Sequence, residues 1–179
     1  HAYIGTPPNP SPQTEHAQAH SDSESPMDNW DVDSSRSAMD ESDEVAYSVD
    51  AAESIETWAG SHVPKLYAEA MDGKPVVAID LGTPTSVEMA DHYHSIRVRI
   101  DDEKAYGDRW FEGGDQNVLV CPNPIRLMKK MIGARVLRVE FSPFNSNMAI
   151  AEFHIVGFDS SKFAAIEALD RYRLRRHKR

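Results

Sequence analysis

The chain has 179 residues, of which 40% are hydrophobic, and a formal net charge of -10 at pH 7. This length predicts one domain with room for a terminal arm, and the acidic excess argues against nucleic-acid binding by the body of the protein. Cys121 is the single cysteine, so no disulfide forms within the chain, and no apolar run reaches the roughly 18 residues that a membrane span needs.

The two ends of the chain differ in charge. Residues 1–29 are rich in Pro, Ser, Asp, Glu, His and Gln, a composition that buries too little apolar surface to offset the entropy of ordering, so we expect a disordered arm. Residues 171–179 carry six basic side chains, which we interpret as a solvated tail able to touch an acidic partner. Because the first residue is histidine, we expect either a processed product or a trimmed chain, in which any export signal would already be gone.

Apolar and polar residues alternate in several segments beyond residue 30, which predicts β-strands. The first clear strand is 44–50, whereas 51–61 stays ambiguous because it also tolerates a helix. Asp72-Gly73 between two apolar runs is typical of a tight hairpin turn. The remaining segments that we assign as strands before residue 122 are 65–71, 75–81, 94–100, 105–111 and 117–121.

Two helices are predicted. Asn123 as N-cap and Pro124 at the first helical position begin a short helix over 125–132, and Gly133 ends it. A second helix is expected over 161–173. The residues on its packed side are Phe163, Ile166, Leu169 and Tyr172.

The strongest local signal is the segment 133–158, which has the pattern of two strands joined by a turn. Every second residue is apolar on both strands, which is typical of a half-buried antiparallel hairpin. The turn 143–147 contains a proline with fixed φ and asparagines that tolerate the left-handed region.

These elements predict a mainly β fold, an antiparallel β-sandwich or small partly open barrel with one short inserted helix and a C-terminal helix. Strands and helices do not alternate along the chain, which argues against a doubly wound nucleotide-binding fold. The chain divides into an arm at 1–29, a single antiparallel β domain at 30–171 and a basic tail at 172–179.

Four blocks follow one another in order along this domain. They are Trp30-Asp31-Val32 with 37–51, Pro64-Lys65-Leu66 with 71–74, 97–101 with Arg109-Trp110, and 124–131 with 138–145, 151–153 and 157–159. In this order they resemble the TagO/VasI-type proteins associated with bacterial type VI secretion, a group with relatives in prophages. The resemblance spans residues 30–171, and the order of the blocks is more telling than any one of them.

The resemblance implies a non-enzymatic, envelope-associated accessory protein that works by contact with protein partners of a secretion or phage-derived assembly. It implies a periplasmic location if a signal peptide has been removed, and otherwise a cytoplasmic or virion-associated one. The family's strand cysteine falls at Ala70 here, and its C-terminal cysteine, near 169–171, is also absent. This loss fits a relative outside an oxidising compartment. An alternative is a structural or decoration protein of a phage particle that uses the same domain.

A second alternative is a zinc-dependent hydrolase. His92 and His94 are spaced to place both rings on one face of a strand, as a zinc site requires, with Asp91 and Asp80 nearby. Glu88 and His154 are both candidates for the third ligand. Our first interpretation predicts no metal, no cofactor and no catalytic residue, and it expects Cys121 to be a buried strand cysteine because an apolar run precedes it.

Four aromatic residues are candidates for an aromatic contact surface, although we expect most of them to pack in the core: Trp58, Trp110, Phe111 and Phe144. The predicted protein contacts are surface residues near the hairpin ends. Trp110 and Phe111 are neighbours in one strand, so they point to opposite faces, and one of them belongs to the core. The predicted contact residues are Arg99, Asp101, Trp110, Pro143, Phe144 and Asn145.

Overall fold

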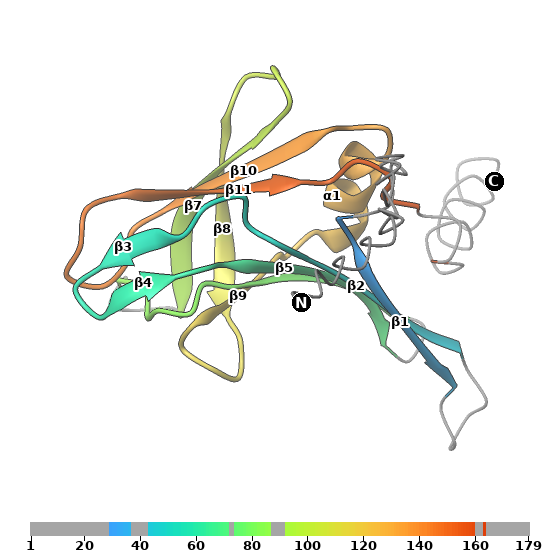
Figure 1. Cartoon of the computed structure of the whole chain (residues 1–179), viewed down its shortest axis with the longest axis horizontal. Helices are drawn as coiled ribbons and strands as arrows, with labels where there is room; N and C mark the ends of the chain where they lie inside the picture. The colour runs from blue at the N-terminus through green and yellow to red at the C-terminus, as the bar shows by residue number, and fades with distance from the viewer. Residues whose placement is uncertain (1–28, 37–42, 72–73, 87–91, 160–162, 164–179) are drawn as a thin grey trace, which may run out of the picture.

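The computed structural model describes residues 29–36, 43–71, 74–86, 92–159 and 163 (Figure 1). This part of the chain forms eleven strands and one helix. In chain order they are β1 (Asp31–Arg36), β2 (Asp43–Asp50), β3 (Ile55–Thr57), β4 (Gly60–His62), β5 (Lys65–Met71), β6 (Lys74–Asp80), β7 (Tyr93–Ile100), β8 (Tyr106–Glu112), β9 (Val118–Val120), α1 (Pro124–Met131), β10 (Val136–Phe141) and β11 (Ala149–His154).

Nine strands form one antiparallel sheet in the order β1-β2-β5-β6-β9-β8-β7-β10-β11, and β3 pairs with β4 separately. The sheet curls, and this brings the distant strands β2 and β11 into contact. Beside this contact, the backbone N–H of Ala52 donates to the carbonyl oxygen of Glu152 at 2.8 Å. In Figure 1, β7 and β8 run across the direction of β5 and β11. The predicted mainly β, antiparallel, sandwich-like fold with one short inserted helix is confirmed.

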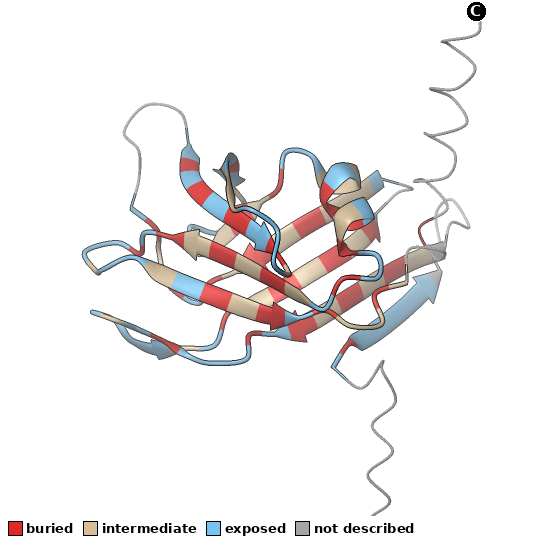
Figure 2. Cartoon of the chain, turned by 90° about the horizontal axis from the view of Figure 1, so that it is seen from above, coloured by how far each residue is buried: buried red, intermediate tan, exposed pale blue. Residues whose placement is uncertain are grey.

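Buried and exposed residues alternate along the strands, which shows which face of the sheet forms the core. Along β7, Ile96, Val98 and Ile100 are buried while the residues between them are exposed, and Figure 2 shows the same alternation along other strands. α1 packs over β6 and buries one stripe of its surface, formed by Leu127, Met128 and Met131. Four aromatic rings pack together at the β1–β2 side of this core, and they belong to Trp30, Tyr47, Phe158 and Phe163.

The helix begins and ends close to its predicted bounds. Pro124 occupies the first turn and Asn123 is the N-cap residue, although its side chain makes no capping hydrogen bond. Gly133 follows the helix with φ +74°, the left-handed conformation that ends many helices. Lys129 and Lys130 lie in the last turn, where positive charge is favourable beside the helix dipole.

The hairpin prediction for 133–158 is also confirmed. β10 pairs antiparallel with β11, and Val139 and Phe153 are completely buried on its inner face. Asn145 in the turn has φ +52°, as its tolerance of the left-handed region allows. Met71 of β5 faces Lys74 of β6, a register that fits a two-residue turn.

Three strands were not expected from the sequence. β1 lies at the edge of the sheet and pairs with β2, and the ambiguous 51–61 segment forms the β3–β4 hairpin. Short polar strands of this kind depend on backbone pairing with a neighbour more than on their own side-chain pattern. The predicted arm except Asn29, the predicted basic tail, and all of the predicted C-terminal helix except Phe163 lie outside the described residues. Within the described ranges, no helix is both long enough and apolar enough to cross a bilayer.

Candidate protein-contact surface

Two large aromatic side chains meet at the surface where two turns come together. Trp58 follows β3 and is 61% exposed, and Phe144 lies in the β10–β11 turn and is 52% exposed. Their ring centroids lie 6.4 Å apart with an interplanar angle of 74°, an edge-to-face contact. We call this pair the aromatic platform. Met148 and Ile150, farther along the same hairpin, are also more than half exposed.

The turn that carries Trp58 is held by its own hydrogen bonds and by the neighbouring hairpin. The Thr57 hydroxyl donates to the Gly60 carbonyl oxygen at 3.1 Å and accepts from the Ala59 N–H at 3.2 Å. The Trp58 N–H donates to Ser146 Oγ at 3.1 Å, which joins this turn to the β10–β11 turn. Gly60 has φ +116°, a backbone conformation that glycine adopts readily and that is strained for a residue with a side chain. Glycine at this position therefore permits the sharp turn.

Phe144 is held by a segment that comes from elsewhere in the chain. We call residues 82–86, which follow β6, the strap. The Phe144 N–H donates to the Pro84 carbonyl oxygen at 2.9 Å, and the Ser86 N–H donates to the Ser142 carbonyl oxygen at 2.9 Å. The Ser86 hydroxyl also donates to the Pro143 carbonyl oxygen at 3.1 Å. The strap therefore fixes the backbone on both sides of buried Pro143.

A buried polar cluster lies behind the strap. His94 of β7 is only 4% exposed, and its Nδ1 lies 2.9 Å from Thr85 Oγ1 and 3.0 Å from the Ser86 carbonyl oxygen. Its Nε2 lies 3.6 Å from Glu112 Oε2 on β8. The cluster therefore ties the strap to the middle of the sheet.

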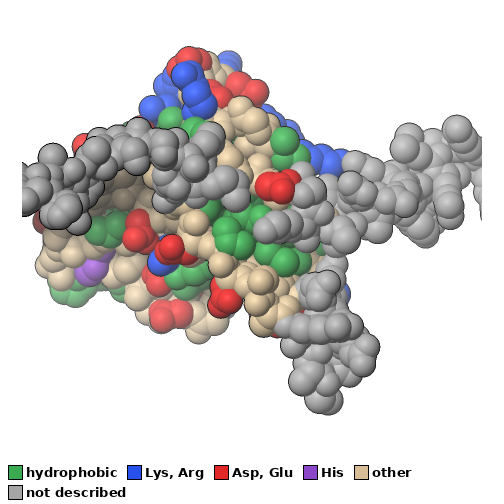
Figure 3. All heavy atoms as spheres, turned by 45° about the vertical axis from the view of Figure 1, so that its right-hand side comes forward, with side chains coloured by type: hydrophobic (Ala, Val, Ile, Leu, Met, Phe, Trp, Pro, Cys, Tyr) green, Lys and Arg blue, Asp and Glu red, His purple; other side chains and the backbone are tan. Residues whose placement is uncertain are grey.

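The predicted contact residues separate into two groups and do not form one site. Arg99 and Asp101 lie at the end of β7, beside the start of β10, whereas Phe144 and Asn145 follow the other end of β10. Figure 3 shows Lys, Arg, Asp and Glu side chains gathered at the top of the view, where Figure 1 places the β7–β8 turn. Arg99 is exposed there and pairs with Asp102 at 3.6 Å.

Two of the predicted surface contacts are wrong. Trp110 is completely buried, and its indole N–H donates to Asp108 Oδ2 at 3.2 Å, so it belongs to the core. Phe111 takes the outer face, where its ring packs edge-to-face on Tyr93. Pro143 is also buried, beneath the strap. Phe144 and Asn145 are exposed, as predicted.

The zinc alternative gains no third ligand from the described residues. His92 is exposed with φ +55° just before β7, while His94 is already bonded to the strap. Asp80 accepts the Gly82 N–H at 2.8 Å, and His154 lies 3.2 Å from Glu152. Asp91 and Glu88 lie outside the described ranges. Within those ranges, no three or more His, Cys, Asp and Glu side chains are grouped to hold a metal ion.

Cys121 has the environment of an unreactive thiol. It is 4% exposed, directly after β9, and burial raises the pKa of its thiol to about 12. The thiolate is the nucleophilic form, and this environment disfavours it. The expected buried cysteine is therefore confirmed.

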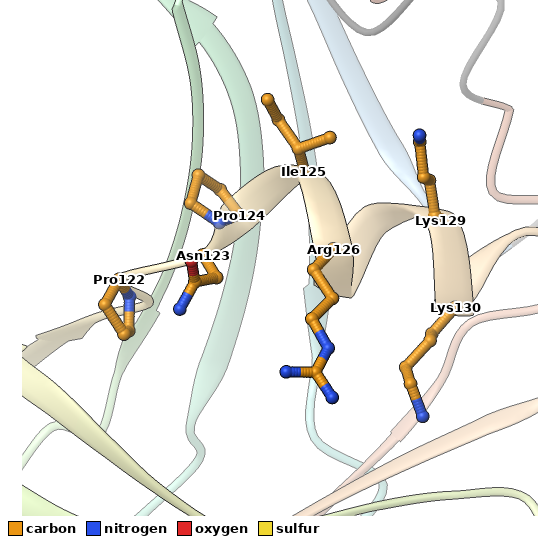
Figure 4. A pocket seen from close by; sticks show the side chains of 7 residues that line it. All are labelled: Pro122, Asn123, Pro124, Ile125, Arg126, Lys129 and Lys130. Atoms are coloured by element: carbon orange, nitrogen blue, oxygen red, sulfur yellow. The ribbon is translucent and has the colours of Figure 1, made fainter. Parts of the chain in front are cut away.

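The sequence interpretation did not identify a hollow beside α1. It has a volume of about 500 Å³ and is lined by Pro122, Asn123, Pro124, Ile125, Arg126, Lys129 and Lys130. In Figure 4, Arg126 and Lys130 point to one side of the helix and Ile125 to the other. Lys130 pairs with Glu103 at 3.0 Å and lies over the Tyr106 ring with Arg126, so part of this positive charge is already engaged within the chain.

Comparisons with known proteins give no information about the function of this chain. No protein-family model matches the chain, and no curated protein and no solved structure matches it.

Proposed function

We propose that this protein is a non-enzymatic binding module that acts by protein–protein contact, with the aromatic platform at the centre of its contact surface. One observation carries the proposal: two adjacent aromatic side chains are more than half exposed, although hydrogen bonds hold the backbone of both turns. Aromatic side chains are enriched in the cores of protein interfaces, and tryptophan is among the residues that most often dominate their binding energy.

The platform is suited to binding because its geometry exists before a partner arrives. Trp58 and Phe144 already touch, and the Ser146 and Pro84 hydrogen bonds hold the chain at each of them. A partner therefore loses little of its binding energy to ordering these turns. Fully burying one large apolar side chain contributes about 1.5–3 kcal/mol, and more than half of each ring is still exposed, so a partner that covers both rings gains a large part of this contribution from each.

The setting that we propose is a secretion or phage-derived assembly, with the protein in an accessory, partner-holding role. The support for it is the order of sequence blocks that resembles TagO/VasI-type proteins. The same resemblance supports a periplasmic location for a chain whose export signal has been removed, and a cytoplasmic or virion-associated location otherwise.

A photo-crosslinking experiment tests the contact surface. The full chain carries p-benzoylphenylalanine at position 144 in the cells that produce it, and a matched chain carries it at position 132. Ile132 is a fair control because it is 47% exposed and lies at the end of α1. We expect a discrete crosslinked protein from position 144 alone, and Trp58→Ala in the same chain should reduce its yield. Equal crosslinking from both positions, or a yield that Trp58→Ala leaves unchanged, would contradict the proposal.

Affinity for the crosslinked protein then measures the weight of each ring. Trp58→Ala and Phe144→Ala should each weaken binding about 30-fold, which corresponds to the roughly 2 kcal/mol typical of a central aromatic contact. Ile132→Ala should leave the affinity within about 2-fold. Because all three side chains are about half exposed or more, each variant should keep its fold.

A further inference from the structure

We propose that the hollow beside α1 is the docking site of the chain's own acidic arm, and that residues 15–24 of the arm supply the anionic contacts. The support comes from the charge of the hollow, the charge of the arm and the short path between them. The inference does not depend on the proposed function, because α1 and the two turns of the aromatic platform lie at opposite ends of the molecule in Figure 1.

The hollow combines an apolar wall with positive charge. Its apolar wall comes from two prolines and Ile125, and its charged wall comes from Arg126, Lys129 and Lys130. No acidic side chain is among the described residues that line it. A segment that fits this lining therefore carries carboxylates.

Arg126 is the cation of the hollow that is most available to a carboxylate. It is exposed, and its guanidinium carbon lies 5.9 Å from the centroid of the Tyr106 ring. Among the residues that the structure describes, no carboxylate pairs with it. The contact with the ring positions the guanidinium and leaves its N–H groups to donate to an anion.

Lys130 adds a second cation that a carboxylate is able to reach. Its Nζ lies 3.0 Å from Glu103 Oε2 and 5.1 Å from the centroid of the Tyr106 ring. The Glu103 side chain is 60% exposed, and exposed ion pairs of this kind contribute little to stability. A carboxylate of the arm therefore replaces Glu103 at small cost.

The arm has the complementary charge. Residues 1–28 contain Glu15, Asp22, Glu24 and Asp28, and they contain no lysine or arginine. Their composition predicts no folded core of their own, so an extended segment is what we expect to reach the hollow. Attraction between exposed charges is screened beyond about 8 Å at physiological salt, so docking requires that the carboxylates come close to Arg126.

The register of the sheet shows how far the arm has to reach. One row of residues crosses four strands from β1 to β6, and it consists of Val32, Tyr47, Ala68 and Val77. The Cys121 N–H continues this row, because it donates to the Val77 carbonyl oxygen at 2.8 Å, and the hollow begins at the next residue. β1 and β9 are four strand spacings apart, which is about 19 Å along the sheet.

The arm is long enough to cover this distance. Trp30 is buried in the aromatic cluster beside β2, which fixes the point from which the arm departs. Glu24 precedes Trp30 by six residues, and six extended residues span about 20 Å. Asp22 and Glu15 lie still farther from Trp30, so all three carboxylates are able to reach the hollow. The attachment also keeps the arm at an effective concentration on the order of millimolar, so weak contacts are sufficient.

Paramagnetic broadening in nitrogen-15 NMR of the full chain tests the docking. A nitroxide is attached to Ser23→Cys in a chain where Cys121→Ala removes the other thiol, and spectra are recorded before and after the nitroxide is reduced. We expect the amide signals of Ile125 and Arg126 to lose intensity while the nitroxide is active. The amide signal of Phe144 should keep its intensity, because the β10–β11 turn lies far from α1 (Figure 1).

Two substitutions that remove the same charge separate the hollow from the rest of the surface. Arg126→Gln should reduce the loss of intensity at Ile125. Arg97→Gln is the matched control, because Arg97 is an exposed arginine on β7 that pairs with Glu140 at 3.1 Å, and it should leave the loss unchanged. Both positions are exposed, so both variants should keep the fold.

A change in the arm keeps the test decisive if Arg126→Gln does not fold. Asp22→Asn combined with Glu24→Gln removes two negative charges and leaves the hollow intact. The loss of intensity at Ile125 should shrink in this chain as it does in Arg126→Gln. A loss that persists in full would contradict the role of the carboxylates.

Other occupants and other destinations of the arm give different results. A mixture of nitrogen-15 chains without nitroxide and unlabelled chains with nitroxide detects an arm that reaches a second copy, and an equal loss of intensity in this mixture would overturn docking within one chain. Loss of intensity at residues 171–179 in place of α1 would show that the arm binds the basic tail. Unchanged signals throughout α1, or equal effects of Arg126→Gln and Arg97→Gln, would likewise overturn the proposal.

Discussion

Asp101 and Val136 hydrogen-bond to each other twice where the β7–β8 turn meets the start of β10. The Asp101 N–H donates to the Val136 carbonyl oxygen at 2.9 Å, and the Val136 N–H donates to Asp101 Oδ1 at 2.8 Å. The Arg135 N–H donates to the same Oδ1 at 2.9 Å. Asp101 has φ +45°, a conformation that Asp adopts more readily than most residues. Its carboxylate therefore has a structural task within the chain.

This carboxylate should make stability depend on pH in acid. The N–H groups of Val136 and Arg135 lower the pKa of Asp101 below its ordinary value of 3.8. A carboxyl group whose pKa is lower in the folded state stabilises that state above the unfolded value, and the contribution disappears as pH falls through the folded value. Asp101→Asn should therefore be less stable than the wild type at neutral pH, and the difference should shrink below pH 3.8. Urea denaturation at a series of pH values measures it.

Asp102 provides the control for that measurement. It is the next residue in the same turn, its side chain is 91% exposed, and its partner Arg99 lies 3.6 Å away. Because exposed ion pairs contribute little, Asp102→Asn should change the denaturation midpoint much less than Asp101→Asn at neutral pH. Equal effects of the two substitutions would show that the backbone hydrogen bonds to Asp101 have no special weight.

Two apolar residues on β11 test which face of the hairpin carries the core. Phe153 is completely buried, whereas Ile150 on the other face is 56% exposed. Phe153→Ala should lower the free energy of unfolding by about 3–5 kcal/mol because it leaves a cavity. Ile150→Ala should stay within about 0.5 kcal/mol of the wild type. Chemical denaturation of both variants decides the point, and similar losses would contradict the assignment of faces.

Gly133 should be needed for its backbone conformation alone. A Cβ at this position would meet no atom within 4 Å, yet φ is +74°, where a side chain is strained. Gly133→Ala should therefore cost about 1–2 kcal/mol of stability. Gly107→Ala is the matched control, because that site is equally open and its φ lies outside the left-handed region, so thermal unfolding should show little change. A neutral Gly133→Ala would contradict the conformational explanation.

Cys121 should not react in the folded protein. Burial raises the pKa of its thiol to about 12, so very little thiolate is present at neutral pH. Ellman's reagent should modify the native chain slowly and the chain in denaturant rapidly, with a rate in native buffer that follows unfolding. Rapid modification of the folded chain would show that the thiol is accessible.

The alternation of apolar and polar residues was sufficient to predict which face of each longer strand is buried. Leu137, Val139 and Phe141 are buried as the alternation indicates, because burial of one face is what that pattern reflects. β1 and the β3–β4 hairpin have weaker patterns and were missed. Their strands form through backbone pairing with neighbours, and side-chain alternation does not report such pairing.

The candidate site was found only in part. Phe144 and Asn145 were correctly placed at the surface, since a turn with Pro and Asn is exposed. Trp110 was placed there wrongly, because alternation shows that Trp110 and Phe111 face opposite sides without showing which side is the core. Trp58 is a candidate for an aromatic contact surface but not one of the six predicted contact residues, because no local pattern shows that its turn is joined to Ser146, 88 positions away.

The local features follow from the amino-acid sequence: the faces of the main strands, the ends of α1, and the turn of the β10–β11 hairpin. These follow from side-chain hydrophobicity and from the φ values that Pro, Gly and Asn permit within a few residues. The contact of Trp58 with Phe144, and the position of His94 between Ser86 and Glu112, arise from the folded arrangement of the strands. Such contacts depend on strand order and on the curl of the sheet, which bring together residues that no local pattern connects.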